Sequence, residues 1–243
     1  MKKKCALITG ASGGIGSSIA LRLARDGFAV AACYRSDEAG IASLAAELDV
    51  IGAEYKIYRA DVADYSQMNT VFADATEEFG GVSVLVNNAG VAQQKLFTDI
   101  TEEEFDFITG VNFKGVFNCC KCAVPFMVNQ KSGKIINISS MWGVYGASCE
   151  TVYSATKAAV IGLTKALARE LAPSNIQVNC VAPGAIDTKM NSNLSPERAA
   201  LADEIPMGRF GLPGEIAGVV SFLAGSDSDY VTAQVITADG GMT

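Results

Sequence analysis

Residues 4–16 read Lys4-Cys-Ala-Leu-Ile-Thr9-Gly10-Ala-Ser-Gly13-Gly14-Ile-Gly16, a short apolar run followed directly by a glycine-rich turn. Residues 18–25 then have the apolar period of a helix, Gly27 suits its C-terminal cap, and residues 28–34 form a second apolar run of strand length. In this order of strand, turn, helix and strand, such a turn is typical of dinucleotide binding. Glycines let the backbone approach a pyrophosphate, whose charge the helix N-terminus favours. The predicted cofactor contacts in the turn are Gly10, Ser12, Gly13, Gly14, Ile15 and Gly16.

The end of the second strand indicates which dinucleotide binds. An acidic residue about 20 positions after the glycines would hold the ribose 2′-hydroxyl of NAD. This strand ends instead at Tyr34-Arg35-Ser36, and the first carboxylate is Asp37. The planar guanidinium of Arg35 can pair with a 2′-phosphate, so NADP(H) is favoured over NAD(H), with these three residues as predicted contacts. Two alternatives stay open: Arg35 as a solvated surface residue, and Asp37 turned inward.

A second pattern, Tyr153-Ser-Ala-Thr-Lys157, indicates acid/base chemistry. Residues four apart lie on one face of a helix, so the phenol and the ammonium would point into the same space. A tyrosine has an ordinary pKa of about 10, and a nearby positive charge is expected to lower it. The chain contains no histidine, which leaves Tyr153 few rivals as a proton donor. Taken alone, the spacing occurs by chance in many helices.

The rest of the chain continues the alternation of strands and helices. Helices are predicted at residues 66–79 and 152–171, and a capping-box pattern at Thr101 predicts the start of a long helix. Further strands are predicted at residues 55–60, 82–86, 134–139, 176–182 and 234–238. Apolar βα units predict a single doubly wound, Rossmann-type α/β domain over residues 1–243, with a seven-stranded parallel sheet covered by helices on both faces. Residues that follow strand ends converge on the rim where such sheets bind ligands: Arg35, Asp61, Asn88, Ser140, Pro183 and Gly184.

Composition narrows the class of protein further. The 243 residues are 49% hydrophobic and 19% charged, which suits one large α/β domain. A formal charge of −7 argues against nucleic acid or an anionic membrane as a partner, and no apolar run reaches the roughly 18–20 residues that span a bilayer. Seven cysteines without a disulfide-like framework indicate a reducing cytoplasm. Cys119 and Cys122 have a CxxC spacing but no second pair and no histidine, so no metal site is expected.

These motifs together resemble the short-chain dehydrogenase/reductase family. The resemblance rests on Thr9-Gly10-x-x-x-Gly14-x-Gly16, Asn87-Asn88-Ala89-Gly90, Asn112, Ser140, Tyr153-x-x-x-Lys157 and Pro183-Gly184, in this order along the whole chain. It implies a homotetramer in which Ser140 holds a substrate carbonyl and Tyr153 donates a proton. It also implies that Lys157 lowers the tyrosine pKa and binds the nicotinamide ribose, and that Asn112 keeps a relay water in place. Taken singly, Ser140 could be a strand-end hydroxyl and Asn112 a helix residue bonded to backbone.

The same resemblance implies further cofactor contacts. Asp61 and Val62 would line the adenine pocket, and Asn88, Ala89 and Gly90 would lie along the adenosine ribose. The nicotinamide end would be bordered by Pro183, Gly184, Ile186 and Thr188, with Tyr153 and Lys157. One departure concerns Gly13, where many NADP-dependent members carry a basic residue. Arg35 would then supply most of the 2′-phosphate recognition.

Within the family, the segments 205–216 and 238–242 resemble 3-oxoacyl-[acyl-carrier-protein] reductases. The expected reaction is NADPH-dependent, reversible reduction of a ketone, with an acyl thioester or small molecule as substrate. Acyl carrier protein is a possible partner: Lys131 falls at one expected docking position, and Ser174 stands where another is usually arginine. The segment 142–150 also resembles reductases of free ketones, steroids and ketone-modified elongation factor P. A substrate lid is expected at about residues 188–211, and a non-enzymatic NADP(H) sensor is the alternative of another class.

Overall fold

The computed structural model describes residues 3–188 and 198–243. Its first strand, β1 (Cys5–Thr9), is buried along its whole length. Successive side chains of a strand point to opposite faces of the sheet. Cys5 and Leu7 accordingly pack into the core on one face, and Ala6 and Ile8 pack into the core on the other. A strand that is apolar on both faces therefore belongs in the middle of a sheet covered on both sides.

The sheet has seven strands in the order β3-β2-β1-β4-β5-β6-β7, and every neighbouring pair is parallel. The chain order reverses between β1 and β4, which is where open α/β sheets bind ligands. The predicted seven-stranded parallel sheet is confirmed, and each strand lies within one residue of its predicted bounds. After β1 the strands are β2 (Ala29–Tyr34), β3 (Tyr55–Arg59), β4 (Val82–Asn87), β5 (Gly133–Ile138), β6 (Ile176–Pro183) and β7 (Val235–Ala238).

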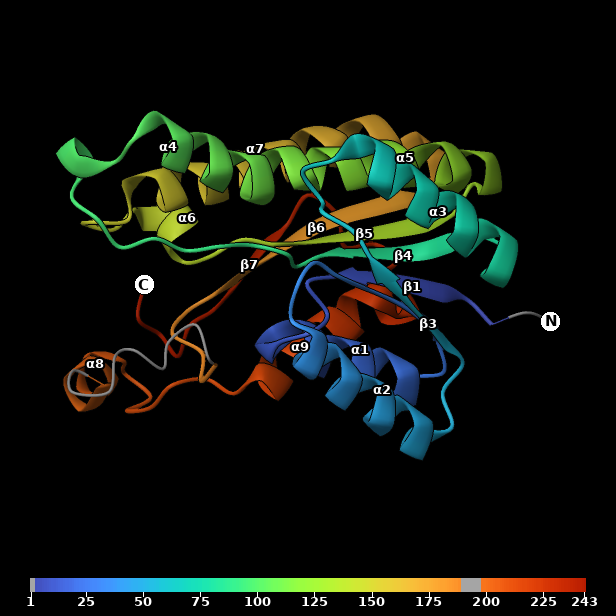
Figure 1. The fold of residues 1–243 in the computed structure, drawn as a ribbon, viewed down its shortest axis with the longest axis horizontal. Coiled ribbons are helices and arrows are strands. Elements are labelled where there is room, and N and C mark those ends of the chain that lie inside the picture. The colour runs from blue at the N-terminus through green and yellow to red at the C-terminus, as the bar shows by residue number, and fades with distance from the viewer. Residues whose placement is uncertain (1–2, 189–197) are drawn as a thin grey trace.

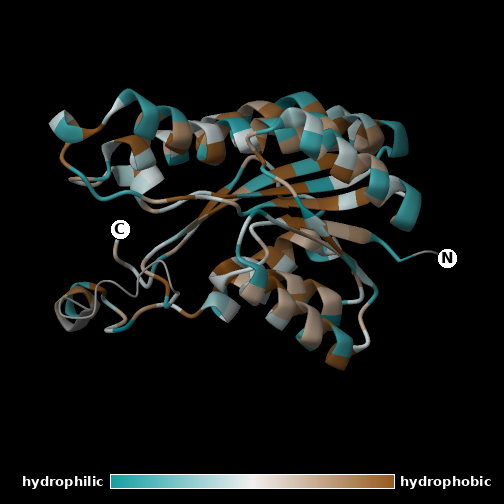
Figure 2. Ribbon diagram, viewed as in Figure 1, coloured by the Kyte–Doolittle hydropathy of each residue, from teal (hydrophilic) through white to brown (hydrophobic). Residues whose placement is uncertain are grey.

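Helices cover both faces of this sheet, as Figure 1 shows. One layer holds α1 (Gly14–Arg25), α2 (Glu38–Ile51) and α9 (Pro213–Ala224). The opposite layer holds α3 (Tyr65–Phe79), α4 (Glu102–Thr109), α5 (Gly115–Gln130) and α7 (Thr151–Leu171). Hydrophobic residues run along the strands between the two layers (Figure 2). Shorter helices are η1 (Phe97–Asp99), η2 (Gly110–Lys114), α6 (Trp142–Tyr145), η3 (Ala172–Ser174), α8 (Arg198–Glu204) and η5 (Ser226–Ser228).

The long helix expected from Thr101 is interrupted. Its capping box is confirmed, since the Thr101 side chain accepts from the Glu104 N–H and the Glu104 carboxylate accepts from the Thr101 N–H. The α-helix ends at Thr109, and residues 110–114 form the π-helical turn η2 before α5 begins. A Cβ on Gly115 would lie 2.5 Å from a methyl carbon of Val62, so the chain passes very close to the β3–α3 loop here. The π turn carries Asn112 into the interior, as such turns often do at functional sites.

Part of the expected lid, residues 189–197, lies outside the described residues. The residues on the two sides of the expected lid are hydrogen-bonded to each other. The Asp187 N–H donates to the Gly211 carbonyl at 2.8 Å, and the Gly211 N–H donates to the Ala185 carbonyl at 3.0 Å. The described end of the lid region also contacts the C-terminal segment, since the Met207 N–H donates to the Gly240 carbonyl at 3.2 Å.

All seven cysteines are free thiols. Within the described residues, no helix is long and apolar enough to cross a membrane, and no group of three or more possible metal ligands gathers in one place.

Candidate active site

The glycine turn is closely packed, and a Cβ would meet other atoms at less than 3 Å at Gly10, Gly14 and Gly16. Gly10 has a φ of +63°, and a Cβ there would lie 2.9 Å from the Cα of Ala89. A Cβ on Gly16 would lie 2.1 Å from the Gly10 carbonyl oxygen. Gly13 differs, because its φ is −143° and nothing lies within 4 Å of an added Cβ. No side chain among the described residues caps α1, so its first N–H groups are free to bind an anion.

Thr9 and Asn88 join the glycine turn to the end of β4. The Thr9 hydroxyl oxygen accepts from the backbone N–H groups of Asn88 and Ala89, each at 3.0 Å. The Asn88 side-chain amide donates to the carbonyls of Thr9 and Gly10 at 3.0 and 3.1 Å. The Asn88 side chain is thus used to hold the turn in place.

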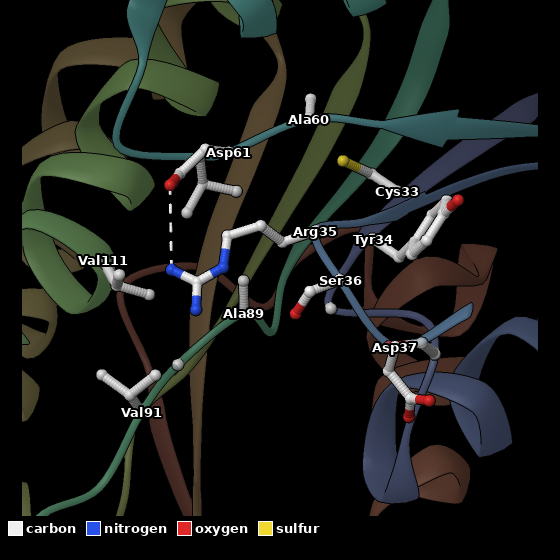
Figure 3. A pocket seen from close by; sticks show the side chains of 14 residues that line it. Cys33, Tyr34, Arg35, Ser36, Asp37, Ala60, Asp61, Ala89, Val91 and Val111 are labelled. Atoms are coloured by element: carbon white, nitrogen blue, oxygen red, sulfur yellow. Dashed lines mark ion pairs between the residues drawn. The ribbon is translucent and has the colours of Figure 1, made fainter. Parts of the chain in front are cut away.

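A pocket opens beside the turn at the ends of β1, β2, β3 and β4 (Figure 3). Arg35 extends across it, and its Nη1 lies 3.7 Å from Asp61 Oδ2. Asp37 also borders the pocket, but its Oδ1 accepts from the Gly40 N–H at 2.9 Å and caps α2. Asp37 thus lies at the pocket with one carboxylate oxygen used as the cap of α2. The lining brings together many predicted cofactor contacts: Gly10, Ser12, Tyr34, Arg35, Ser36, Asp61, Val62, Ala89 and Gly90.

Tyr153 and Lys157 lie together near the same rim. Lys157 Nζ is 5.6 Å from the centre of the Tyr153 ring and donates to the Ile138 carbonyl at 3.0 Å. The Tyr153 hydroxyl interacts with the side chain of Ser140, whose oxygen also accepts from the Trp142 N–H at 3.2 Å. α7 therefore places the phenol between a hydroxyl and an ammonium.

Burial controls the ionisation of this pair. It raises the pKa of Tyr153 to about 12; the Ser140 interaction lowers that pKa, and the charge of Glu150 raises it. Burial also lowers the pKa of Lys157 to about 8, and only 4% of this residue is exposed. The expected lowering of the tyrosine pKa is thus not found in the chain alone. Removing both groups from water disfavours both charged forms, and burial is the largest cause of each pKa shift.

Asn112 is fully engaged with the protein. Its Oδ1 accepts from the Val91 N–H at 2.8 Å, and its Nδ2 donates to the Val91 carbonyl at 2.9 Å and to the Thr156 hydroxyl at 3.2 Å. It therefore ties the chain after β4 to α7. A Cβ on Gly90 would lie 3.2 Å from Lys157 Nζ and 3.4 Å from Asn112 Oδ1. Gly90 thus links the pocket beside the glycine turn to the Tyr153 site.

The chain after β6 closes the site from the other side. Met141 N–H donates to the Pro183 carbonyl at 2.9 Å, close to Ser140. Ile186 is buried, and a Cβ on Gly14 would lie 2.8 Å from the Thr188 methyl carbon. Thr188 therefore lies against the start of α1, where Ile15 follows. The structure brings this segment, the glycine turn and the Tyr153 site to one edge of the sheet.

Two residues at this edge were missed by sequence reasoning. Thr156 contributes its hydroxyl to the Asn112 contacts, and it also donates to the Tyr153 carbonyl at 2.7 Å. Phe107 places its ring 5.4 Å from the guanidinium carbon of Arg35. Neither residue stands in a recognisable motif, and only the packing of α4 and α7 shows where they lie.

A glycine turn at a helix N-terminus, an adjoining pocket and a buried Tyr–Lys pair define a dinucleotide-binding α/β oxidoreductase. Residues 10–243 match the family described as "Enoyl-(Acyl carrier protein) reductase". The chain belongs to the short-chain dehydrogenase/reductase family. It is an NAD(P)-dependent oxidoreductase acting on CH–OH groups and is similar to 3-oxoacyl-[acyl-carrier-protein] reductases.

Named relatives and solved structures agree with this assignment. The chain is 44% identical to the 3-oxoacyl-[acyl-carrier-protein] reductase FabG of Thermotoga maritima, with 100% of this chain and 98% of the relative covered. It is 40% identical to Nodulation protein G of Azospirillum brasilense, covering 100% and 99%. A short-chain type dehydrogenase/reductase from Mycobacterium marinum superposes with a TM-score of 0.94 at 39% identity, covering 99% and 95%. A single-residue variant of actinorhodin polyketide ketoreductase with NADPH superposes with a TM-score of 0.95 at 33% identity, covering 99% and 97%.

Proposed function

We propose that this protein uses NADPH to reduce the ketone of a 3-oxoacyl thioester to a secondary alcohol, in a reversible reaction. The observation that carries the proposal is the Tyr153–Lys157 pair with Ser140, joined to the glycine turn through Gly90. The pair supplies a proton donor, and the turn supplies a place for the cofactor beside it. The full-length similarity to 3-oxoacyl-[acyl-carrier-protein] reductases supports the substrate class.

The residues present fit a dinucleotide. The uncapped start of α1 and the close-packed glycines would receive the pyrophosphate, because free N–H groups and the helix dipole favour an anion. The pocket beside β2 would hold the adenosine end, with Asp61 and Val62 at the adenine and Arg35 at the 2′-phosphate. Gly184, Ile186 and Thr188 would border the nicotinamide. When bound, the cofactor supplies the hydride.

The chain's own residues would hold the carbonyl and move the proton. The hydroxyls of Ser140 and Tyr153 would donate to the carbonyl oxygen and stabilise the charge that develops there. Because burial holds the pKa of Tyr153 at about 12, the phenol is protonated at pH 7 and can donate to the forming alkoxide. Lys157 would stabilise the resulting phenolate and bind the nicotinamide ribose. Its pKa of about 8 leaves most of the ammonium charged at pH 7.

Asn112 is proposed to be a positioning residue, which holds neighbouring groups of the site in place. Its side-chain groups all bond to Val91 and Thr156, so it would hold the ends of the proton path together. A relay water in the same place would have to use other groups, such as its backbone carbonyl. This differs from a role in which the amide itself binds the water.

Partners follow from the same reasoning. Lys131 is exposed at the C-terminal end of α5, and Lys165 and Arg169 are exposed on α7. These basic residues are the proposed contacts for an acidic acyl carrier protein, with Ser174 in place of a further charge. A homotetramer is proposed from the family resemblance. Phe113, in the turn before α5, and Phe117, at the start of α5, have exposed aromatic side chains. These side chains are consistent with association of subunits.

A substrate panel tests this function. Purified protein would be assayed with NADPH and with NADH on acetoacetyl-carrier protein, acetoacetyl-N-acetylcysteamine, free ketones and a steroid ketone. Tyr153→Phe serves as the background control. The proposal predicts oxidation of NADPH with both thioesters, fastest with the carrier-bound one. Turnover of free ketones or steroids alone would contradict the acyl substrate, and tight NADPH binding with no turnover of any ketone would favour a sensor.

A further inference from the structure

Arg35 stands where cofactor preference is decided, but nothing in β2 holds its side chain. The residue follows the last position of β2, and its side chain is 45% exposed. A free arginine side chain carries about 2 kcal/mol of rotamer entropy. Whatever restrains the guanidinium before the cofactor arrives would therefore strengthen its contact with a phosphate.

Phe107 makes a cation–π contact with this guanidinium. The guanidinium carbon lies 5.4 Å from the centre of the Phe107 ring, within the range of a cation–π contact. Phe107 is on α4, one helical turn before Val111, which lines the same pocket. Its side chain is 48% exposed, so core packing alone does not account for its position.

Asp61 restrains one edge of the same group. Asp61 Oδ2 lies 3.7 Å from Arg35 Nη1, and the carboxylate is itself fixed because Oδ1 accepts from the Ala63 N–H at 2.9 Å. A separation of 3.7 Å between partly exposed groups is a weak ion pair. It orients the guanidinium but leaves most of its five N–H donors for a phosphate, which forms stronger charge-assisted bonds.

A second arginine at this corner is differently placed. Arg59 pairs with Glu38 at 3.1 Å, and its Nε donates to the Arg35 carbonyl at 3.3 Å. It thus supports the backbone of Arg35 and is already bound to a carboxylate. Arg35 is the one of the two whose guanidinium reaches across the pocket (Figure 3).

We propose that Phe107 is a specificity-determining residue, which stacks on Arg35 and so holds the guanidinium ready for the 2′-phosphate of NADP(H). The cation–π contact leaves the N–H donors of Arg35 available to the phosphate. The inference rests on the proposed function, because it assumes that Arg35 recognises that phosphate. Preference for NADPH over NADH is then a joint property of β2 and α4.

Binding measurements test the proposal without turnover. Dissociation constants for NADPH, NADH, adenosine 2′,5′-bisphosphate and AMP would be measured by calorimetry for the wild type, Phe107→Leu and Phe107→Tyr. Phe105→Leu is the matched control, since Phe105 lies on the same helix and is also 48% exposed. Phe107→Leu is expected to weaken binding of both 2′-phosphorylated ligands about two- to fivefold, the range of an exposed cation–π contact. NADH and AMP binding should not change, Phe107→Tyr should restore the wild-type values, and Phe105→Leu should have no effect.

Equal weakening of all four ligands would overturn the inference, because it would indicate a general packing defect. Unchanged or tighter binding of NADPH by Phe107→Leu would also overturn it. Arg35→Leu tests the proposed cofactor preference separately from the role of Phe107. If Arg35→Leu leaves the NADPH-to-NADH ratio unchanged, the proposed cofactor preference fails. If Arg35→Leu lowers that ratio and Phe107→Leu does not, only the role of Phe107 fails. In the Arg35→Leu background, Phe107→Leu should have no further effect on the ratio.

Discussion

We compare the free energy of unfolding of Lys157→Met with that of wild type at the same pH. The variant should compare more favourably with wild type at neutral pH than at high pH. Lys157 is 4% exposed, and its ammonium donates to the Ile138 carbonyl. Burial lowers its pKa from 10.5 to about 8, so the folded protein holds the proton less tightly than the unfolded chain. The cost of keeping the buried charge is fully present below about pH 8. It fades as pH rises toward the unfolded pKa and is absent above it.

The magnitude follows from the size of the pKa change. Each pKa unit corresponds to about 1.4 kcal/mol, so the buried charge costs up to about 3 kcal/mol at pH 7. Methionine has a similar length and carries no charge. The variant also loses the bond to Ile138 and changes the packing, but these losses are the same at every pH. At each pH, the free energy of unfolding of wild type is therefore subtracted from that of the variant. The value obtained at pH 10 is then subtracted from the value obtained at pH 7.

Urea denaturation at the two pH values, at fixed protein concentration, measures this quantity. The stability of Lys157→Met relative to wild type should be about 2 to 3 kcal/mol more favourable at pH 7 than at pH 10. Lys165→Met, at an exposed position on the same helix, should differ from wild type by less than about 0.5 kcal/mol at both pH values. A stability difference for Lys157→Met that is the same at pH 7 and pH 10 would refute the burial argument.

Four further variants, of which Gly13→Ala is a control, test the packing of the fold. Gly16→Ala should lower the free energy of unfolding by about 1–3 kcal/mol, because the new Cβ would lie 2.1 Å from a backbone oxygen. Gly13→Ala has open space around the new Cβ and should change the free energy of unfolding by less than about 0.5 kcal/mol. Equal losses in thermal melts would contradict this contrast. Asn137→Ala should cost about 1–3 kcal/mol, since the buried amide bonds to Asn87 and to the Thr164 hydroxyl; a neutral effect in urea denaturation would contradict it. Thr101→Ala should cost about 1 kcal/mol by removing the cap of α4, and local hydrogen exchange that stays unchanged would be the contrary result.

The sheet could be predicted from sequence because most of its strands are short apolar runs between polar or glycine-rich residues; β3, with Lys56 and Arg59, is less apolar. β6 shows the pattern clearly: all eight residues are buried, and Asn175 before it has the left-handed φ of +57° that ends the preceding turn. Neighbouring βα units then leave few possible topologies. The residues at the strand ends were therefore placed near one another without any structural information.

The interior of the site could not be predicted in the same way. The pKa of Tyr153 depends on how much water the fold removes, and the Tyr–Lys spacing carries no such information. The π turn lies before α5, where Gly115 packs against Val62 of the β3–α3 loop, and this loop is distant in sequence. Phe107 and Arg35 are likewise far apart along the chain, so no local pattern in the sequence predicts their cation–π contact.

The central claim is that Tyr153 donates the proton to the carbonyl oxygen of the substrate. The most direct measurement compares Tyr153→Phe with wild type in single-turnover reduction of acetoacetyl-N-acetylcysteamine, with NADPH binding measured in parallel. The phenyl ring keeps the packing but has no proton to give. We predict a reduction rate about 10²- to 10⁴-fold slower, with NADPH still bound by the variant. A rate close to that of wild type would contradict it.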